Sequence, residues 1–215
     1  MHMADALVSP PVATGMAVAS LAVGAYSIFR IKKENKPENI PVMGVMGAFV
    51  FATQMVNFTI PGTGSSGHLC GGLLLSALIG PYGGFLSMMA ILLLQCLLFA
   101  DGGLMAYGCN VWNMAFYACF FGYFCIYKPI LSKNPSKKKI LIASILGSIL
   151  SLQLGAFSVT LETLISGVTE LPFLTFLSFM QPIHLAIGFV EGLITSAVLI
   201  FVYNTRPEML NINEK

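Results

Sequence analysis

The chain begins Met1-His2, and a free terminal amine beside a histidine is a chelating unit for a transition metal. The Met1 amine, the His2 backbone nitrogen and the His2 imidazole can bind one ion together, closing two small chelate rings. A fourth in-plane position stays open. A histidine at position 2 also arises by chance, so the pair gains meaning from the other two histidines, His68 and His184, which we expect on the same membrane face.

A glycine-rich segment, residues 57–68 (NFTIPGTGSSGH), ends in His68 and offers the fourth donor. Irregular backbone near membrane depth is tolerated only where protein or a water-filled cavity surrounds it, and glycine allows a ligand to approach closely. The alternative is an ordinary turn. With His68 the donor set becomes four nitrogens in a square plane, which suits Ni(II) or Cu(II). No carboxylate cluster is present for Mg²⁺ or Ca²⁺.

Four further polar residues are expected around these donors, where they would orient them. They are Asn57, Asn110, His184 and Glu191. The last two lie seven residues apart, about two helical turns, and therefore share a helix face. An ionisable group inside a span is a functional hypothesis by default, although hydrogen bonding within the bundle explains it equally well. The five cysteines lie in apolar runs without metal-finger spacing and are expected to act as small hydrophobes.

The composition predicts the fold class. Of the residues, 56% are hydrophobic and 9% charged, and mean hydropathy is +0.83, whereas soluble domains carry about 25% charged residues. We therefore expect an all-α polytopic membrane helix bundle, with residues 1–215 as a single integral membrane domain. The net charge of +2 is too small to indicate nucleic acid as a partner. Hydrolase motifs and a phosphate-binding loop are absent, so the chain is not expected to be an enzyme or to hydrolyse ATP.

About seven transmembrane helices are expected, one of them short: residues 10–31, 42–58, 69–79, 82–100, 109–127, 140–165 and 183–203. With seven crossings, all 11 Lys and Arg residues fall on one side. The positive-inside rule makes that side the cytoplasm, so the N-terminus lies outside and the C-terminus inside. The outer side then carries Asp5, Asp101 and Glu170, with Glu162 nearby, and such a surface attracts cations.

Two ladders of small residues recur every four positions and allow close helix packing. The first is Gly44, Ala48 and Ala52, and the second is Ala143, Gly147, Ser151 and Gly155. Such faces usually pack within their own bundle, but one of them is a candidate for docking another membrane protein.

The sequence blocks together resemble a known family. Met1-His2, PGTGSSGHLCGG (residues 61–72), LLFADGGLMAYGCNVWNMA (97–115) and HLAIGFVEGLITSAV (184–198) are similar to those of the NikM/CbiM substrate-binding components of energy-coupling-factor transporters, and closest to NikM. The resemblance implies a multi-pass protein of the cytoplasmic membrane of a prokaryote. It implies high-affinity uptake of Ni²⁺, or of Co²⁺, across that membrane, without an organic cofactor. It implies as partners a transmembrane coupling protein and two ABC-type ATPases, with room for a small accessory membrane subunit.

By the same resemblance, the metal ligands are the Met1 amine, the His2 backbone and imidazole nitrogens, and His68. The face of Gly44, Ala48 and Ala52 resembles the contact for the coupling protein, with the second ladder as runner-up. This chain has PGTGSSGH where many relatives have the shorter PGTSGH. Two other functions stay open: an ion-coupled secondary transporter, for which Glu191 would be the coupling carboxylate, and a membrane metalloenzyme with an open metal position.

Overall fold

The computed structural model describes residues 1–34, 36–37, 39–169 and 171–212, so Glu170 lies outside the described residues. The elements in chain order are η1 (Asp5–Leu7), α1 (Pro10–Glu34), α2 (Asn39–Gln54), β1 (Phe58–Ile60), β2 (Ser65–Gly67), α3 (Gly72–Phe99), α4 (Tyr107–Asn110), η2 (Val111–Tyr127), α5 (Lys128–Leu131), α6 (Lys137–Ser166), α7 (Phe173–Thr205) and η3 (Pro207–Met209). Within these residues, five helical segments are long and apolar enough to cross a membrane, and α2 is a shorter apolar helix. The predicted helical membrane bundle is confirmed at this level.

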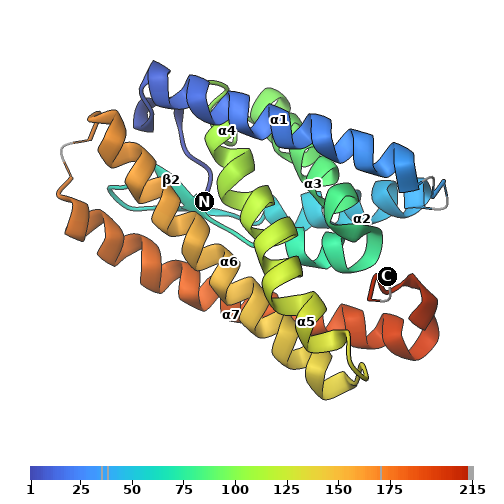
Figure 1. The fold of residues 1–215 in the computed structure, drawn as a ribbon. Helices are drawn as coiled ribbons and strands as arrows, with labels where there is room; N and C mark the ends of the chain where they lie inside the picture. The colour runs from blue at the N-terminus through green and yellow to red at the C-terminus, as the bar shows by residue number, and fades with distance from the viewer. Residues whose placement is uncertain (35, 38, 170, 213–215) are drawn as a thin grey trace.

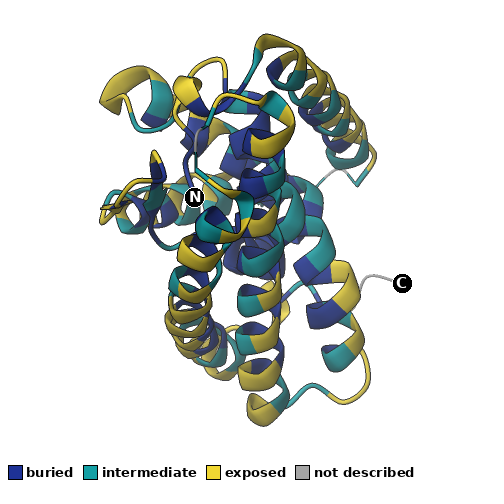
Figure 2. Cartoon of the chain, turned by 90° about the vertical axis from the view of Figure 1, so that its left-hand side faces the viewer, coloured by how far each residue is buried: buried dark blue, intermediate teal, exposed yellow. Residues whose placement is uncertain are grey.

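The helices lie side by side, with α6 against α7 and the N-terminus inside the bundle next to β2 (Figure 1). The linker after α1, the linker after α5 and the C-terminal segment all lie at one end, on the right in Figure 1. The connection from α6 to α7 lies at the other end. Exposed residues follow the outer faces of the helices, while buried ones gather where helices meet (Figure 2). The basic linkers thus share one end, as the sequence predicts.

The all-α prediction was wrong at the segment 57–68. Here β1 and β2 pair antiparallel, with Phe58 opposite Gly67 and Ile60 opposite Ser65. The helix predicted to reach residue 58 ends at Gln54 instead. A side chain on Gly67 would come 2.6 Å from the Phe58 ring, so the close pairing requires glycine immediately before His68.

The two helices predicted at 69–79 and 82–100 are the arms of α3, which is broken at Gly80 (φ 79°, ψ 160°). A Cβ on Gly84 would lie 2.9 Å from the backbone nitrogen of Ser76. In a straight helix, residues eight apart are separated by about 12 Å along the axis. The chain therefore folds back on itself at Gly80, as the predicted break between two helices requires.

The break leaves one carbonyl to be satisfied from elsewhere. Pro81 has no N–H, so the Ala77 carbonyl, four residues earlier, cannot receive its helical hydrogen bond. The backbone N–H of Asn211 donates to it instead, at 2.8 Å. The C-terminal segment thereby contacts the end of the short arm of α3 next to Gly80.

The predicted start of the last helix at 183 was wrong, because α7 begins at Phe173 and contains Pro182. The apolar residues before Pro182 continue the helix, since a transmembrane helix tolerates the loss of a single backbone hydrogen bond. The helix predicted at 109–127 is present, but residues 111–127 are wound as a π-helix, and the N–H of Lys128 donates to the Tyr123 carbonyl five residues earlier. Long π-helices are rare and often occur at functional sites.

Candidate metal site

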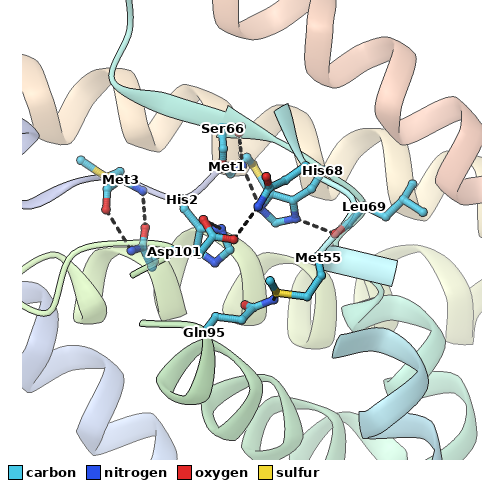
Figure 3. Close-up of polar contacts among 11 residues, drawn as sticks. Met1, His2, Met3, Met55, Ser66, His68, Leu69, Gln95 and Asp101 are labelled. Atoms are coloured by element: carbon cyan, nitrogen blue, oxygen red, sulfur yellow. Dashed lines mark hydrogen bonds and ion pairs between the residues drawn. The ribbon is translucent and has the colours of Figure 1, made fainter. Parts of the chain in front are cut away.

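The N-terminal residues lie inside the protein. Met1 is 1% exposed, His2 3% and Met3 0%. They run beside β2 like an added strand: Met3 forms a bridge with Ser65, and the Ser66 N–H donates to the His2 carbonyl at 3.3 Å. The Met1 amine donates to the Ser66 carbonyl. The first residues are therefore an ordered part of the core (Figure 3).

Asn110 fixes this segment from α4. Its Oδ1 accepts the Met3 N–H at 2.7 Å, and its Nδ2 donates to the Met3 carbonyl at 3.2 Å. A Cβ on Gly155 would clash with the Asn113 backbone carbonyl and come 2.8 Å from the Met1 sulfur. Glycine at this position of the second ladder thus allows the close approach of the Asn113 backbone and of the Met1 side chain. The structure places Asn110 beside the expected ligands, as the sequence predicts.

The nitrogens expected to bind a metal converge. The Met1 amine lies 3.2 Å from Nε2 of His68, and the rings of His2 and His68 stack with centroids 4.5 Å apart and planes inclined by 24°. Neighbouring nitrogens around an ion with bonds of ~2.05 Å would be about 2.9 Å apart in a square plane. The observed separation therefore needs little adjustment to admit an ion.

The tautomer of His68 suits it for metal binding. Its Nδ1 lies 2.7 Å from the Leu69 carbonyl. A carbonyl only accepts hydrogen bonds, so Nδ1 carries the proton and Nε2 presents its lone pair toward Met1. Among the described residues, no three His, Cys, Asp or Glu side chains form a metal-holding group. A metal at this position therefore depends on the terminal amine and main chain.

Burial also keeps the donors free of protons. It lowers the pKa of the Met1 amine from 8.0 to about 5. Burial, together with the charges of the Met1 amine and of His2, lowers the pKa of His68 well below its usual value, and burial lowers that of His2. A buried group resists charging because the protein interior solvates ions poorly. At neutral pH all three groups are therefore neutral, the form that binds a metal.

Asp101 contacts the site directly, although the sequence indicated it only as an outer acid. Its Oδ1 lies 3.1 Å from Nδ1 of His2, and its Oδ2 accepts a hydrogen bond from Nδ2 of Asn57 at 2.6 Å. Burial alone would raise the pKa of Asp101, but the hydrogen bond and charge of His2 outweigh it and lower that pKa. Asn57 is therefore linked to His2 indirectly, because both contact Asp101.

A cavity of about 440 Å³ opens onto this group and is lined by His2, Asp5 and Asp101, among others. Asp5 is held by its own hydrogen bond, since its Oδ1 accepts the Ala106 N–H at 3.0 Å. Glu162, expected near the outer side, is buried and accepts a hydrogen bond from Nδ2 of Asn113 at 2.7 Å. The acids that line the cavity are therefore Asp5 and Asp101, and they give a cation an approach to His2.

Glu191 holds the backbone that follows His68. Its carboxylate oxygens accept the N–H groups of Cys70, at 2.5 Å, and Gly71, at 3.1 Å. The Cys70 carbonyl accepts Nε2 of Gln54 at 2.5 Å. Sequence reasoning assigned no role to Gln54, yet a glutamine in an apolar helix without charged residues was a usable signal, because polar groups in membrane spans usually have a structural or functional role.

His184 is the expected residue that makes no hydrogen bond to this group, although it lies close enough to interact electrostatically with the Met1 amine and His68. It is fully buried, and its Nδ1 lies 2.8 Å from the Met180 carbonyl in its own helix. In the part of the chain that the structure describes, its Nε2 has no hydrogen-bond partner. The Cys70 thiol donates to the Met114 carbonyl, and burial raises its pKa well above the usual value, which agrees with cysteines that act as small hydrophobes.

The two small-residue ladders have different surroundings. Gly44, Ala48 and Ala52 are exposed on α2, whereas all four residues of the second ladder are buried within the bundle. Gly44 and Ala48 also line an apolar groove of about 500 Å³ between α2 and α3. Of the two ladders, the first is accessible to another membrane protein.

Comparisons with known proteins agree with a transport role. Residues 2–209 match the family model described as the cobalt uptake substrate-specific transmembrane region. A protein of Archaeoglobus fulgidus with the provisional name fused nickel transport protein NikMN is 36% identical over 98% of this chain, which spans 68% of that protein. The cobalt transport protein CbiM of Acetoanaerobium sticklandii is 32% identical over 97% of this chain and 85% of its own length. The crystal structure of a truncated transition metal transporter superposes with a TM-score of 0.86 at 29% identity, covering 95% of this chain and 99% of that one.

Proposed function

Because the chain belongs to the CbiM family of cobalt uptake substrate-specific transmembrane regions, we propose that it captures Ni²⁺ from outside the cell with high affinity. The observation that carries this proposal is the buried Met1 amine, 3.2 Å from Nε2 of His68 and beside the stacked ring of His2. The ion would bind four nitrogens: the amine, the His2 backbone and imidazole nitrogens, and His68 Nε2. It is the cargo of the transporter, held until release on the other side.

Nickel is preferred over cobalt on the donor set. A planar four-nitrogen field suits Ni(II), although Co(II) can occupy similar ligands. Cobalt is the second candidate, and a specific observation favours it: the family model that spans residues 2–209 is named for cobalt uptake. Copper would bind such nitrogens more tightly than either metal, so its exclusion depends on availability.

The orientation follows from the charges. The basic linkers and the C-terminal segment lie at one end of the bundle, and the positive-inside rule assigns that end to the cytoplasm. With the fold-back at Gly80, the chain crosses seven times and the metal site faces outside through the cavity beside Asp101. The protein then resides in the cytoplasmic membrane of a prokaryote.

Energy for transport would come from partners. The chain has no phosphate-binding loop, so we propose that it is the substrate-binding component of an energy-coupling-factor transporter, with a transmembrane coupling protein and two ABC-type ATPases. The exposed face of Gly44, Ala48 and Ala52 is the proposed contact with the coupling protein. Small residues there let a partner helix approach closely.

Glu191 argues against a secondary transporter. Such a transporter needs a carboxylate that takes up and releases a coupling ion. Here both oxygens of Glu191 accept backbone N–H groups, from Cys70 and Gly71. The carboxylate therefore has a structural task in holding the segment after His68.

Uptake of radioactive ⁶³Ni²⁺ into cells tests the proposal. Cells that express the chain together with the coupling protein and ATPases are expected to accumulate nickel, and an ATPase variant without hydrolysis is expected to abolish this. Competition by excess Co²⁺ ranks the two metals. Nickel accumulation that persists without any ATPase would instead support a self-sufficient transporter.

A further inference from the structure

We propose that α2 senses whether the metal site is occupied, and that Gln54 is the positioning residue through which it does so. This inference rests on the proposed function, because it concerns how the metal-loaded state reaches the helix that faces the partner. It assigns no new ligand. It assigns to one helix the link between the metal site and the outer surface of the bundle.

The buried side chains of α2 all contact one short segment. Val50 and Gln54 are the buried residues of this helix. Gln54 donates to the Cys70 carbonyl at 2.5 Å, and a Cβ on Gly71 would come 2.7 Å from a Val50 methyl group. Cys70 and Gly71 follow His68 by two and three residues. Gln54 also lies 3.7 Å from the Met88 sulfur in α3. The two fully buried side chains of α2 therefore both contact the backbone next to a proposed metal ligand.

The rest of α2 is less deeply buried. Val42, Met43, Met46 and Phe51 are half-buried and pack against the core, mainly on α3, and the remaining residues are exposed or half-buried. A helix that is half-buried on one side loses fewer apolar contacts on tilting than one that is packed on several sides. A shift of Cys70 and Gly71 therefore moves α2 more readily than it moves the tightly packed α6 and α7.

A second link joins α2 to the other half of the site. Asn57, three residues beyond Gln54, donates to Asp101 at 2.6 Å, and Asp101 lies 3.1 Å from Nδ1 of His2. The end of α2 is thus tied to His68 through Gln54 and to His2 through Asn57. An ion that binds Nδ1 of His2 would displace its contact with Asp101, and binding to His68 would shift the backbone after it, so both links respond to the ion.

The opposite face of α2 is the one that a partner would contact. At 100° per residue, Ala52 lies about 200° from Gln54, and Ala48 lies about 200° from Val50. Both alanines are exposed. One face of α2 therefore holds the metal-site backbone while the other presents the small-residue ladder.

Hydrogen exchange of the purified protein, with and without Ni²⁺, tests the link. In the native protein we expect Ni²⁺ to protect both the 57–68 segment and α2. In Gln54→Met, which keeps the side-chain length but removes the donor, the 57–68 segment should still be protected and α2 should not. Loss of one buried hydrogen bond should also speed transfer of Ni²⁺ to a chelator by about tenfold.

The matched control is Gln153→Met, which removes the amide-to-carbonyl hydrogen bond from Gln153 to Gln181 between α6 and α7. It should leave both readouts at native values. Val50→Ala tests the same anchor by a milder change, and covers the case that Gln54→Met fails to fold. Ni²⁺-dependent protection of α2 that persists in both anchor variants would overturn the inference. So would native protein in which the hydrogen exchange of α2 does not change when Ni²⁺ is added. If the native protein binds neither Ni²⁺ nor Co²⁺, the proposed function fails as well, so the two failures are distinct.

Discussion

At the level of single residues, the site depends on groups that hold the donors as much as on the donors. The Leu69 carbonyl fixes the tautomer of His68, and Asp101 contacts the imidazole of His2. The Leu69 contact is a supporting one, and such contacts typically contribute ten- to a hundredfold to metal affinity. Asp101 instead contacts Nδ1 of His2, the ring nitrogen that closes the chelate with the His2 backbone nitrogen, so an ion would displace this contact and lie beside the carboxylate. The sequence predicted that Met1, His2 and His68 lie together, and the structure brings them together, because histidines and their positions are visible in the sequence. It did not place Asp101 beside His2, since that contact joins distant segments.

Asp101→Asn tests this support. It keeps the shape of the side chain but removes the negative charge beside the bound cation, so Ni²⁺ affinity should fall by about tenfold or more. A titration against a competing chelator measures the change. Asp5→Asn is the matched control, because it removes the same charge from the same cavity while Asp5 hydrogen-bonds Ala106. Equal losses in the two variants would mean that only the overall negative charge of the cavity matters.

The pKa of the Met1 amine predicts how binding depends on pH. Its pKa is lowered to about 5, so the neutral, metal-binding form predominates above that pH and protons compete only below it. In a free Met-His peptide the amine, with a pKa of about 8, is protonated already at neutral pH. Between pH 8 and 6 the protein should therefore lose about 50-fold less Ni²⁺ affinity through its amine than the peptide does. Parallel pH profiles of the two would show that the amine is not buried.

At the level of elements, the sequence predicted most helices and one break between them, but not the strand pair, the π-helix or the start of the last helix. The break between residues 79 and 82 was visible as Gly80-Pro81, because these residues end helices. The pairing of β1 with β2 was not, since three-residue strands rich in serine and glycine have no hydrophobic alternation. The π-helical winding of η2 was not visible either, because its apolar residues satisfy an α-helical pattern equally well. The start of α7 was predicted too late because Pro182 was taken to precede the helix, whereas a transmembrane helix can continue through a proline.

Gly80→Ala tests the fold-back in α3. Gly80 has φ 79°, and a Cβ there would come 2.6 Å from Nδ2 of Asn211. The variant should lose about 1–3 kcal/mol of stability, measured as a lower midpoint of thermal unfolding in detergent. Gly15→Ala is the control, because nothing lies within 4 Å of a Cβ at that helical position and alanine favours a helix. Equal midpoints for Gly80→Ala and the native protein would show that the chain does not reverse there.

At the level of the whole molecule, the proposed metal capture and partner docking would use different surfaces. The expected donors are buried, in the N-terminal segment and directly after β2, whereas Gly44, Ala48 and Ala52 are exposed on α2. Composition and charge were enough to predict a membrane bundle with its basic residues on one side. They did not show which ladder is exposed, because both have the same spacing and only the packing distinguishes them.

Gly44→Leu tests the docking face. A bulky side chain there would keep a partner helix at a distance, so ATP-driven uptake should fall by at least about tenfold. Ni²⁺ binding by the isolated protein should stay unchanged, because Gly44 has open space around it. Val45→Leu, at a neighbouring exposed position, should leave both uptake and binding intact. A loss of uptake with Val45→Leu as well would show that lipid contacts, not a specific face, set the result.

The buried N-terminus is the central claim, and elemental analysis of the purified protein tests it most directly. Protein with a native Met1 terminus, loaded with Ni²⁺ and freed of excess metal, should retain about one ion per chain, as one four-nitrogen site requires. A version extended by two residues before Met1 has no amine at that position and no space for the added chain, since Met1 is 1% exposed. It should retain almost no metal, as should His68→Ala. Stoichiometric nickel in the extended protein would contradict the account.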